Sequence, residues 1–249
     1  MKYFSLFNDS HQVTFKEALF RGLAPDGGLY FPTRVKPLKK SFIDNLKNLG
    51  KSEIAYNVIS QFVGDDIGKK ELTKIIDHSI NFDFPLKQLN ENISVLELFH
   101  GPTMAFKDVG ARFTSRCISY LNKLEKRVTV LVATSGDTGA AVASGFHGVD
   151  GIDVFILYPK NKISKIQEKQ ISTYSGNIYP VQVEGSFDDC QRMVKEALVD
   201  KDLVNKFNFT SANSINISRW IPQMLYYFFA YRQIEKEHAK VSFLSLIHI

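Results

Sequence analysis

The pattern of apolar and polar positions changes once along the chain, near residue 90. Before that point, apolar residues recur at the three- and four-residue spacing of amphipathic helices, most clearly at Ile54, Val58, Ile59 and Phe62. After it, short apolar and β-branched runs alternate with helical stretches. The pattern predicts a small, mainly helical module over residues 1–90, followed by an α/β region.

Polar and small residues mark the expected ends of the early helices. Thr14 and Glu17 have the spacing of a capping box, and Gly22 follows as a stop signal. Further helices are expected to begin at Ser41, Ser52 and Asp66, and the second of these to end at Gly64. The run Pro25-Asp26-Gly27-Gly28 predicts a turn that leads into a short strand.

The α/β region predicts a parallel sheet covered by helices on both faces, because near-continuous apolar strands alternate with helices. Ligands of such sheets bind beyond the carboxyl ends of the strands. The expected strands are 93–99, 128–133, 153–158, 178–183, 207–210 and one near 241. The expected helices are 108–124, 138–147, 164–174, 186–199 and 219–238.

Composition supports a globular protein and excludes several other classes. Of the 249 residues 44% are hydrophobic and 23% charged, and the net charge of +5 is spread along the chain without an aromatic-rich basic stripe, so no nucleic-acid partner is expected. No run of 18 apolar residues occurs, so neither a membrane span nor a secretory signal is expected. Cys117 and Cys190 have no metal-ligand spacing and the histidines form no cluster, so we expect no metal site and a reducing, cytoplasmic location.

One lysine has the position that carbonyl chemistry requires. Lys107 follows the Gly101-Pro102 turn and precedes a helix-forming run, so its amine points at a helix start. The positive partial charge there, together with desolvation, favours the neutral amine that a Schiff-base lysine needs. The alternative is an ordinary solvated lysine. For the nearby His100, we favour a structural hydrogen bond over catalysis.

Two loops at predicted strand ends carry candidate binding groups. Residues 133–141 form a glycine-rich strand-to-helix turn whose amides suit an anion, although its Ser and Thr residues are also plausible helix caps. Residues 211–220 offer hydroxyl, amide and guanidinium donors that suit a phosphate ester. The structural alternative is that these groups are caps, turns and a surface charge. The aromatic residues from Trp220 to Tyr231 have helical spacing and are expected in the core or at a subunit contact.

The segment from Glu97 to Asp108 closely resembles the lysine segment of the threonine synthase family, and residues 21–32 resemble that family's amino-terminal module. The resemblance implies a pyridoxal 5'-phosphate (PLP) enzyme of fold type II, which is tryptophan synthase β-like. It implies that Lys107 holds PLP and acts as the catalytic base, and that Asp137 borders the cofactor. Substrate would be bound by Ser135, Thr138, Asn213, Ser214 and Arg219.

The implied reaction converts O-phospho-L-homoserine and water to L-threonine and phosphate. The implied protein is a monomer or homodimer. Three alternatives stay open: a related PLP lyase such as threonine dehydratase or cysteine synthase, a threonine-synthase-like phospholyase, and a fragment without catalytic activity. The related PLP lyases lack both the phosphate loop that residues 211–219 resemble and the Pro25–Pro32 module.

The chain departs from the family pattern at its end. The Ser-Gly-Asn-Phe-Gly-Asn type loop that cradles the cofactor phosphate in the family is absent from the sequence, as is the hydroxyl that faces the pyridine nitrogen. Residues 244–249 are the in-frame translation of CTG TCT CTT ATA CAC ATC, a transposon mosaic end used in sequencing libraries. We therefore expect a module over 1–90, an incomplete catalytic region over 91–243, a missing carboxyl half, and a non-native tail over 244–249.

Overall fold

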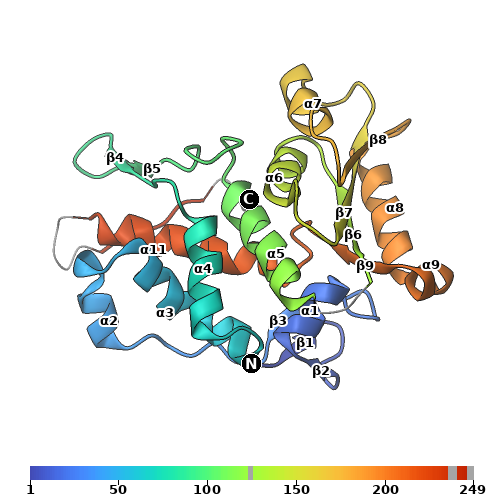
Figure 1. The fold of residues 1–249 in the computed structure, drawn as a ribbon. Coiled ribbons are helices and arrows are strands. Elements are labelled where there is room, and N and C mark those ends of the chain that lie inside the picture. The colour runs from blue at the N-terminus through green and yellow to red at the C-terminus, as the bar shows by residue number, and fades with distance from the viewer. Residues whose placement is uncertain (123–125, 235–239, 246–249) are drawn as a thin grey trace.

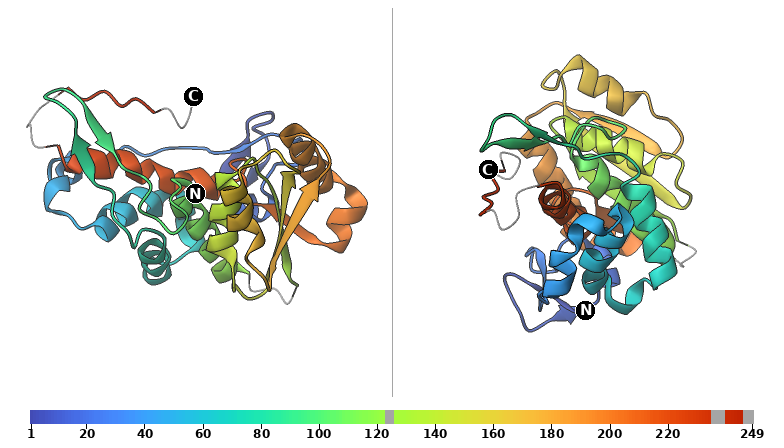
Figure 2. Two further views of the ribbon diagram at one scale, coloured as in Figure 1. Left: turned by 90° about the horizontal axis from the view of Figure 1, so that it is seen from above. Right: turned by 90° about the vertical axis from the view of Figure 1, so that its left-hand side faces the viewer.

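The computed structural model describes residues 1–122, 126–234 and 240–245. A parallel sheet and its helices form one end of the elongated molecule, and α2 (Lys40–Asp44), α3 (Lys51–Val63), α4 (Lys69–Ser79) and α11 (Leu225–Arg232) form the other (Figures 1 and 2). Helix α5 (Lys107–Leu121) lies between the two ends. Within the described ranges, no helix has both the length and the apolar character needed to cross a bilayer.

The chain begins with a small antiparallel sheet of order β2-β1-β3, made of β1 (Tyr3–Ser5), β2 (Gln12–Val13) and β3 (Tyr30–Pro32). The capping box that starts α1 (Phe15–Arg21) is confirmed: the Thr14 hydroxyl accepts a hydrogen bond from the Glu17 amide, and the Glu17 carboxylate accepts one from the Thr14 amide. Gly22 ends the helix at φ 69°, and a Cβ there would lie 3.2 Å from the Ser211 amide nitrogen. The turn at 25–28 and the strand after it are also confirmed.

The predicted starts of the next three helices are wrong, although the helices exist. Their N-caps are Lys39, Gly50 and Gly68, and none of the three has a side-chain capping bond. Ser41 and Ser52 lie inside the first turns of α2 and α3 instead, and Asp66 accepts a hydrogen bond from the Lys16 amide at 2.8 Å. The expected end at Gly64 is confirmed, as is burial of the apolar face of α3.

The run 93–99 forms a shorter strand than expected. Strand β5 (Ser94–Leu96) pairs antiparallel with β4 (Leu86–Gln88) in a separate two-stranded sheet. This hairpin projects from the same end of the molecule as α2 and α11 (Figure 1). It contributes no strand to the parallel sheet described next.

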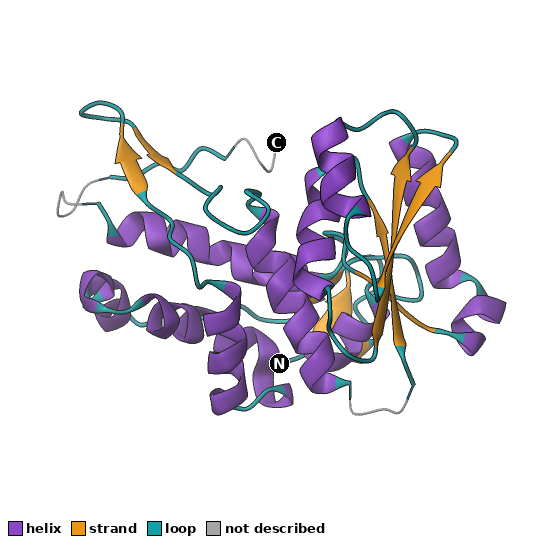
Figure 3. Cartoon of the chain, turned by 45° about the horizontal axis from the view of Figure 1, so that its top comes forward, coloured by secondary structure: helices purple, strands orange, loops and turns teal. Residues whose placement is uncertain are grey.

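The parallel sheet is confirmed, with strand order β8-β7-β6-β9. Its strands are β6 (Val128–Ala133), β7 (Ile152–Pro159), β8 (Ile178–Val183) and β9 (Asn208–Ser211). The helices after them are α6 (Asp137–Phe146), α7 (Lys165–Ser172), α8 (Phe187–Val199) and α9 (Lys201–Lys206). Figure 3 shows helices on both faces of this sheet.

Alternation along β6 explains how one strand serves two apolar cores. Val130 and Val132 belong to the large core that includes α5 and α6, whereas Leu131 and Ala133 pack with Cys190 and Val194 of α8. Successive side chains of a strand point to opposite faces, so a strand buried on both faces is apolar at nearly every position, and in β6 the exception is the half-buried Thr129. Both cysteines are buried and free.

The helix predicted over 219–238 is broken. It consists of α10 (Ile217–Trp220), a 3₁₀ turn η3 (Ile221–Met224) and α11, with Pro222 at the start of the 3₁₀ turn. The ring of Trp220 stacks on Phe31 of β3, which ties this region to the amino-terminal module. The strand expected near 241 is wrong, since residues 240–245 form none. The remaining part of that helix prediction, 235–239, and most of the predicted tail, 246–249, lie outside the described residues.

Candidate active site

The loop before α5 fixes the direction of Lys107. Asp108 is 1% exposed, and its carboxylate accepts hydrogen bonds from the Thr103 amide at 3.0 Å and the Thr103 hydroxyl at 2.6 Å. A Cβ on Gly101 would lie 2.4 Å from an Asp108 oxygen, so glycine is needed for this close approach. On the other side, the Tyr226 hydroxyl donates to the Phe106 carbonyl. The backbone on both sides of Lys107 is therefore held by buried contacts.

The Lys107 amine is mostly shielded from water and faces a carboxylate. Its side chain is 23% exposed, and Nζ lies 3.7 Å from Oδ2 of Asp137 and 4.3 Å from the centroid of the Phe106 ring. Burial lowers the pKa of Lys107 below its usual value; Asp137 opposes this change, and the positive charge of Arg219 adds to it. The direction expected from the sequence is thus found in the structure.

The 133–141 turn is organised by a residue that sequence reasoning treated as a possible cap. The hydroxyl oxygen of Thr134, which is buried, accepts hydrogen bonds from the Gly136 amide at 3.0 Å and the Gly139 amide at 2.8 Å. Ser135 is exposed and Thr138 is half-buried. The turn therefore leaves the two predicted carboxylate-binding hydroxyls at the surface while its backbone is held from inside.

Asp137 has a second partner that sequence reasoning missed. Nε2 of Gln167, in α7, donates to Oδ1 of Asp137 at 2.8 Å, while Oδ2 faces Lys107. The two residues are 30 positions apart, and no local spacing links them. The signal available in the sequence was the Ser164–Gln167 capping-box spacing, which places the glutamine at the start of α7.

The amide of Asn213 joins the 211–219 loop to the end of β6. Its oxygen accepts from the Ala133 amide at 2.9 Å, and its nitrogen donates to the Ala133 carbonyl at 2.7 Å. The neighbouring Ser214 is exposed. The two predicted binding loops therefore meet beside the carboxyl end of β6, as the parallel-sheet rule requires.

Arg219 is buried, at 2% exposure. One terminal nitrogen donates to the Ala212 carbonyl, and the guanidinium packs against Gly110 of α5, where a Cβ would be 3.1 Å from Nε. Burial lowers the pKa of Arg219 to about 10, while Tyr226 and Asp108 act in the opposite direction. Direct binding of a substrate phosphate by Arg219 and Asn213 stays a prediction. Among the described residues, Nε of Arg219 is buried without a hydrogen-bond partner, so the guanidinium keeps a donor beyond its contact with Ala212.

The structure thus brings Lys107 and Asp137 into contact and places Arg219 close enough to influence the lysine. Ser135 and Thr138 lie in the same turn as Asp137, and Ser214 lies in the loop bonded to β6. His100 lies outside this group: its ring pairs with Glu97 at 2.7 Å and stacks on Phe99. This supports the structural interpretation of the histidine.

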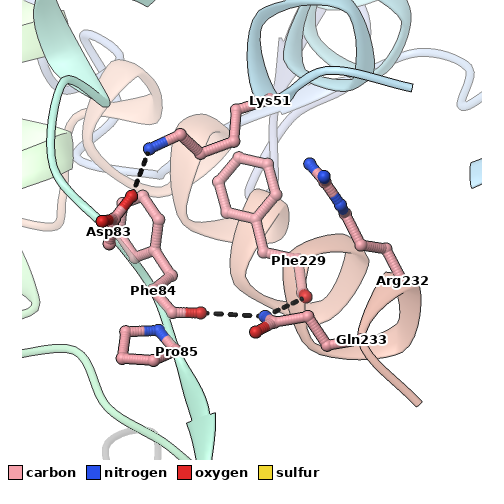
Figure 4. A pocket seen from close by; sticks show the side chains of 7 residues that line it. All are labelled: Lys51, Asp83, Phe84, Pro85, Phe229, Arg232 and Gln233. Carbon is pink, nitrogen blue, oxygen red and sulfur yellow. Dashed lines mark hydrogen bonds and ion pairs between the residues drawn. The ribbon is translucent and has the colours of Figure 1, made fainter. Parts of the chain in front are cut away.

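Two hollows in the surface lie apart from Lys107. One, of about 320 Å³, is lined by residues of α3, α11 and the segment before β4 (Figure 4): Lys51, Asp83, Phe84, Pro85, Phe229, Arg232 and Gln233. Lys51 pairs there with Asp83 at 2.9 Å, and Gln233 donates to two backbone carbonyls. The other, of about 700 Å³, lies between α1, α9 and β9. Neither is lined by a predicted site residue, so the chemistry points to Lys107 rather than to the hollows.

Comparison with known proteins identifies the family. Residues 78–234, more than half of the chain and including Lys107 with both loops, match the profile described as pyridoxal-phosphate dependent enzyme. The chain belongs to the pyridoxal-phosphate dependent enzyme family. Residues 2–80 match the profile described as threonine synthase N terminus. The expected resemblance, fold class and cofactor are confirmed.

Individual relatives agree with both profiles. The chain is 44% identical over 241 residues to threonine synthase of Buchnera aphidicola subsp. Acyrthosiphon pisum, covering 96% of this chain and 56% of that protein. The crystal structure of threonine synthase from Escherichia coli superposes with a TM-score of 0.90 at 41% identity, covering 95% of this chain and 55% of that one. A PLP-bound threonine synthase from Brucella melitensis superposes with a TM-score of 0.87 at 36% identity, covering 97% of this chain and 53% of that one. The chain spans about half the length of the relatives it matches.

Proposed function

We propose that this chain is part of a threonine synthase, which converts O-phospho-L-homoserine and water to L-threonine and phosphate with PLP, in the cytoplasm. The observation that carries the proposal is Lys107. Its amine is shielded, has a lowered pKa, and faces Asp137 beside the turn that follows β6. The names of the relatives and the match of residues 2–80 support the choice among PLP enzymes. The unpaired Cys117 and Cys190 support a reducing compartment.

The residues present fit the carbonyl end of PLP. A carbonyl group needs a neutral amine, and desolvation of Lys107 increases the neutral fraction at a given pH. The fixed loop from Gly101 to Asp108 holds that amine at one place, and the exposed Ser135 leaves the turn beside it open to solvent. Lys107 would therefore hold PLP, with Asp137 next to it.

When bound, PLP supplies an electron sink for the charge left on a substrate carbon that loses a proton. Lys107 is the residue placed to move protons: its free amine would accept the Cα proton of the substrate and, once that proton has been passed on, a Cβ proton. Asp137 favours the ammonium form and so helps the lysine to hold a proton between steps. Ser135 and Thr138 would bind the substrate carboxylate at the start of α6.

Phosphate binding falls to the 211–219 loop in this proposal. The exposed Ser214 is the group a substrate phosphate reaches without rearrangement. Arg219 would contribute a charge-assisted contact through donors that its bond to Ala212 leaves free, and Asn213 would hold the loop against β6 as it does now. A monomer or homodimer remains our proposal for the assembly.

The test uses the protein encoded by the intact gene, purified with PLP and supplied with O-phospho-L-homoserine. We expect L-threonine and phosphate in equal amounts, and Lys107→Ala should abolish both. Formation of 2-oxobutyrate would indicate a related lyase, and release of phosphate without threonine would indicate a phospholyase. Either result would overturn the proposed reaction.

A further inference from the structure

We propose that Gln167 is a positioning residue for Lys107, acting through Asp137. The inference rests on the proposed function, because it assigns the lysine a role whose protonation matters. The Gln167 side-chain amide spans two helix starts. Its nitrogen donates to Asp137 in the first turn of α6, and its oxygen accepts from the Ser164 amide at 3.3 Å and hydroxyl at 3.1 Å at the start of α7.

The contact is built into the backbone. Gly136 has φ 152°, and a Cβ there would lie 2.3 Å from Nε2 and 2.6 Å from Cδ of Gln167. The glutamine amide therefore lies directly over the Gly136 Cα, a position that any larger residue at 136 would block. The Gln167 backbone is itself held, because its amide donates to the Ser164 hydroxyl at 3.2 Å. The Gln167 side chain is thus held at its backbone by the Ser164 hydroxyl and at its amide oxygen by the Ser164 amide and hydroxyl.

The consequence for Lys107 follows from the two oxygens of Asp137. The Asp137 side chain is 52% exposed, so solvent alone would leave it free to rotate away from the lysine. The Gln167 bond to Oδ1 holds the carboxylate with Oδ2 turned to Nζ, at 3.7 Å. The charged groups that act on Lys107 are Asp137 from α6 and Arg219 from α10, with opposite signs. If Asp137 moves away from Lys107, it opposes less strongly the lowering of the lysine pKa by Arg219.

The direction of the effect can be stated. Asp137 stabilises the ammonium form of Lys107, so loss of the Gln167 bond should lower the pKa of the lysine and increase its free-amine fraction at a given pH. Gln167→Met keeps the length and volume of the side chain and removes both the donor to Asp137 and the oxygen that accepts from Ser164. Gln182→Met is the matched control, because Gln182 also donates to a carboxylate of this region, Glu168 in α7, but does not contact Asp137.

The experiment measures the lysine directly, without cofactor or substrate. The full chain is treated with acetic anhydride at a series of pH values, and the extent of acetylation at Lys107 is read by mass spectrometry, with the exposed Lys160 as internal standard. The expected result is a downward shift of the pH profile of Lys107 in Gln167→Met and an unchanged profile in Gln182→Met. An unshifted profile in Gln167→Met overturns the inference, as does an equal shift in both variants.

A second measurement separates positioning from a general loosening of α7. Asp137→Asn alone should shift the pH profile of acetylation at Lys107 downward. Adding Gln167→Met to it should produce no further shift, because the carboxylate that transmits the effect is gone. A further shift in the double variant contradicts the inference. Failure of the proposed function is a separate outcome, since it appears as absence of PLP on Lys107 whatever the acetylation profiles show.

Discussion

Thr134 provides the sharpest test of how the site turn is held. The change Thr134→Val keeps the shape of the side chain and removes a hydroxyl that accepts hydrogen bonds from two amides. The Gly139 amide keeps a partner, the Gly136 carbonyl at 3.1 Å, whereas the amide of the buried Gly136 has no acceptor besides Thr134 within the described part of the chain. An orphaned buried amide costs about 1–3 kcal/mol, so the free energy of unfolding should fall by about that amount.

Urea unfolding of this chain, followed by circular dichroism, measures the loss as a lower midpoint at an unchanged slope. Thr134→Ser is the control, because it keeps the hydroxyl and removes one methyl group, at a cost of about 0.5–1.5 kcal/mol. A valine variant as stable as the parent chain would refute the reasoning. So would a serine variant that loses as much as the valine variant.

Three further predictions follow from the same contacts. Gly110→Ala should destabilise the fold by about 1–3 kcal/mol, because the new Cβ would lie 2.5 Å from the Arg219 carbonyl oxygen. The midpoint of urea unfolding measures this loss, and Gly50→Ala is the control because its new Cβ meets nothing within 4 Å. Arg219→Met should raise the pKa of Lys107, since a cation that opposes the ammonium form is removed; an unshifted or lowered acetylation profile would contradict this. Ser214→Ala in the intact enzyme should raise KM for O-phospho-L-homoserine by about 2- to 10-fold, from the loss of one hydrogen bond, and an unchanged KM would remove Ser214 from the phosphate site.

Much of the fold follows from local patterns. The strand at 128–133 is found with the predicted bounds because every residue in it is apolar or β-branched, which suits a strand that is largely buried on both faces. The helix starts at Ser41 and Ser52 are wrong because the N-caps lie two residues earlier, at Lys39 and Gly50, and neither cap uses a side-chain hydrogen bond. Residues 219–238 contain Pro222, whose missing amide hydrogen was an available signal for a break.

The site was predictable where it depends on neighbours in the chain and not where it depends on packing. The place of Lys107 between a Gly-Pro turn and a helix made it a candidate, and the resemblance of residues 97–108 to a known family selected it over an ordinary solvated lysine. The burial of Arg219 was not, because nothing local distinguishes a guanidinium that packs on Gly110 from one that faces solvent. The bond from Gln167 to Asp137 joins the starts of α6 and α7, which meet only when β6 and β7 pair in register.

Covalent labelling tests the central claim most directly. The protein encoded by the intact gene, incubated with PLP, reduced with borohydride and digested, should carry the pyridoxyl group on the peptide that contains Lys107, in a ratio approaching one per chain. Lys107→Ala should lose that label and the visible absorbance of the bound cofactor together. A label found on another lysine, or a Lys107→Ala enzyme that still forms threonine, would contradict the account.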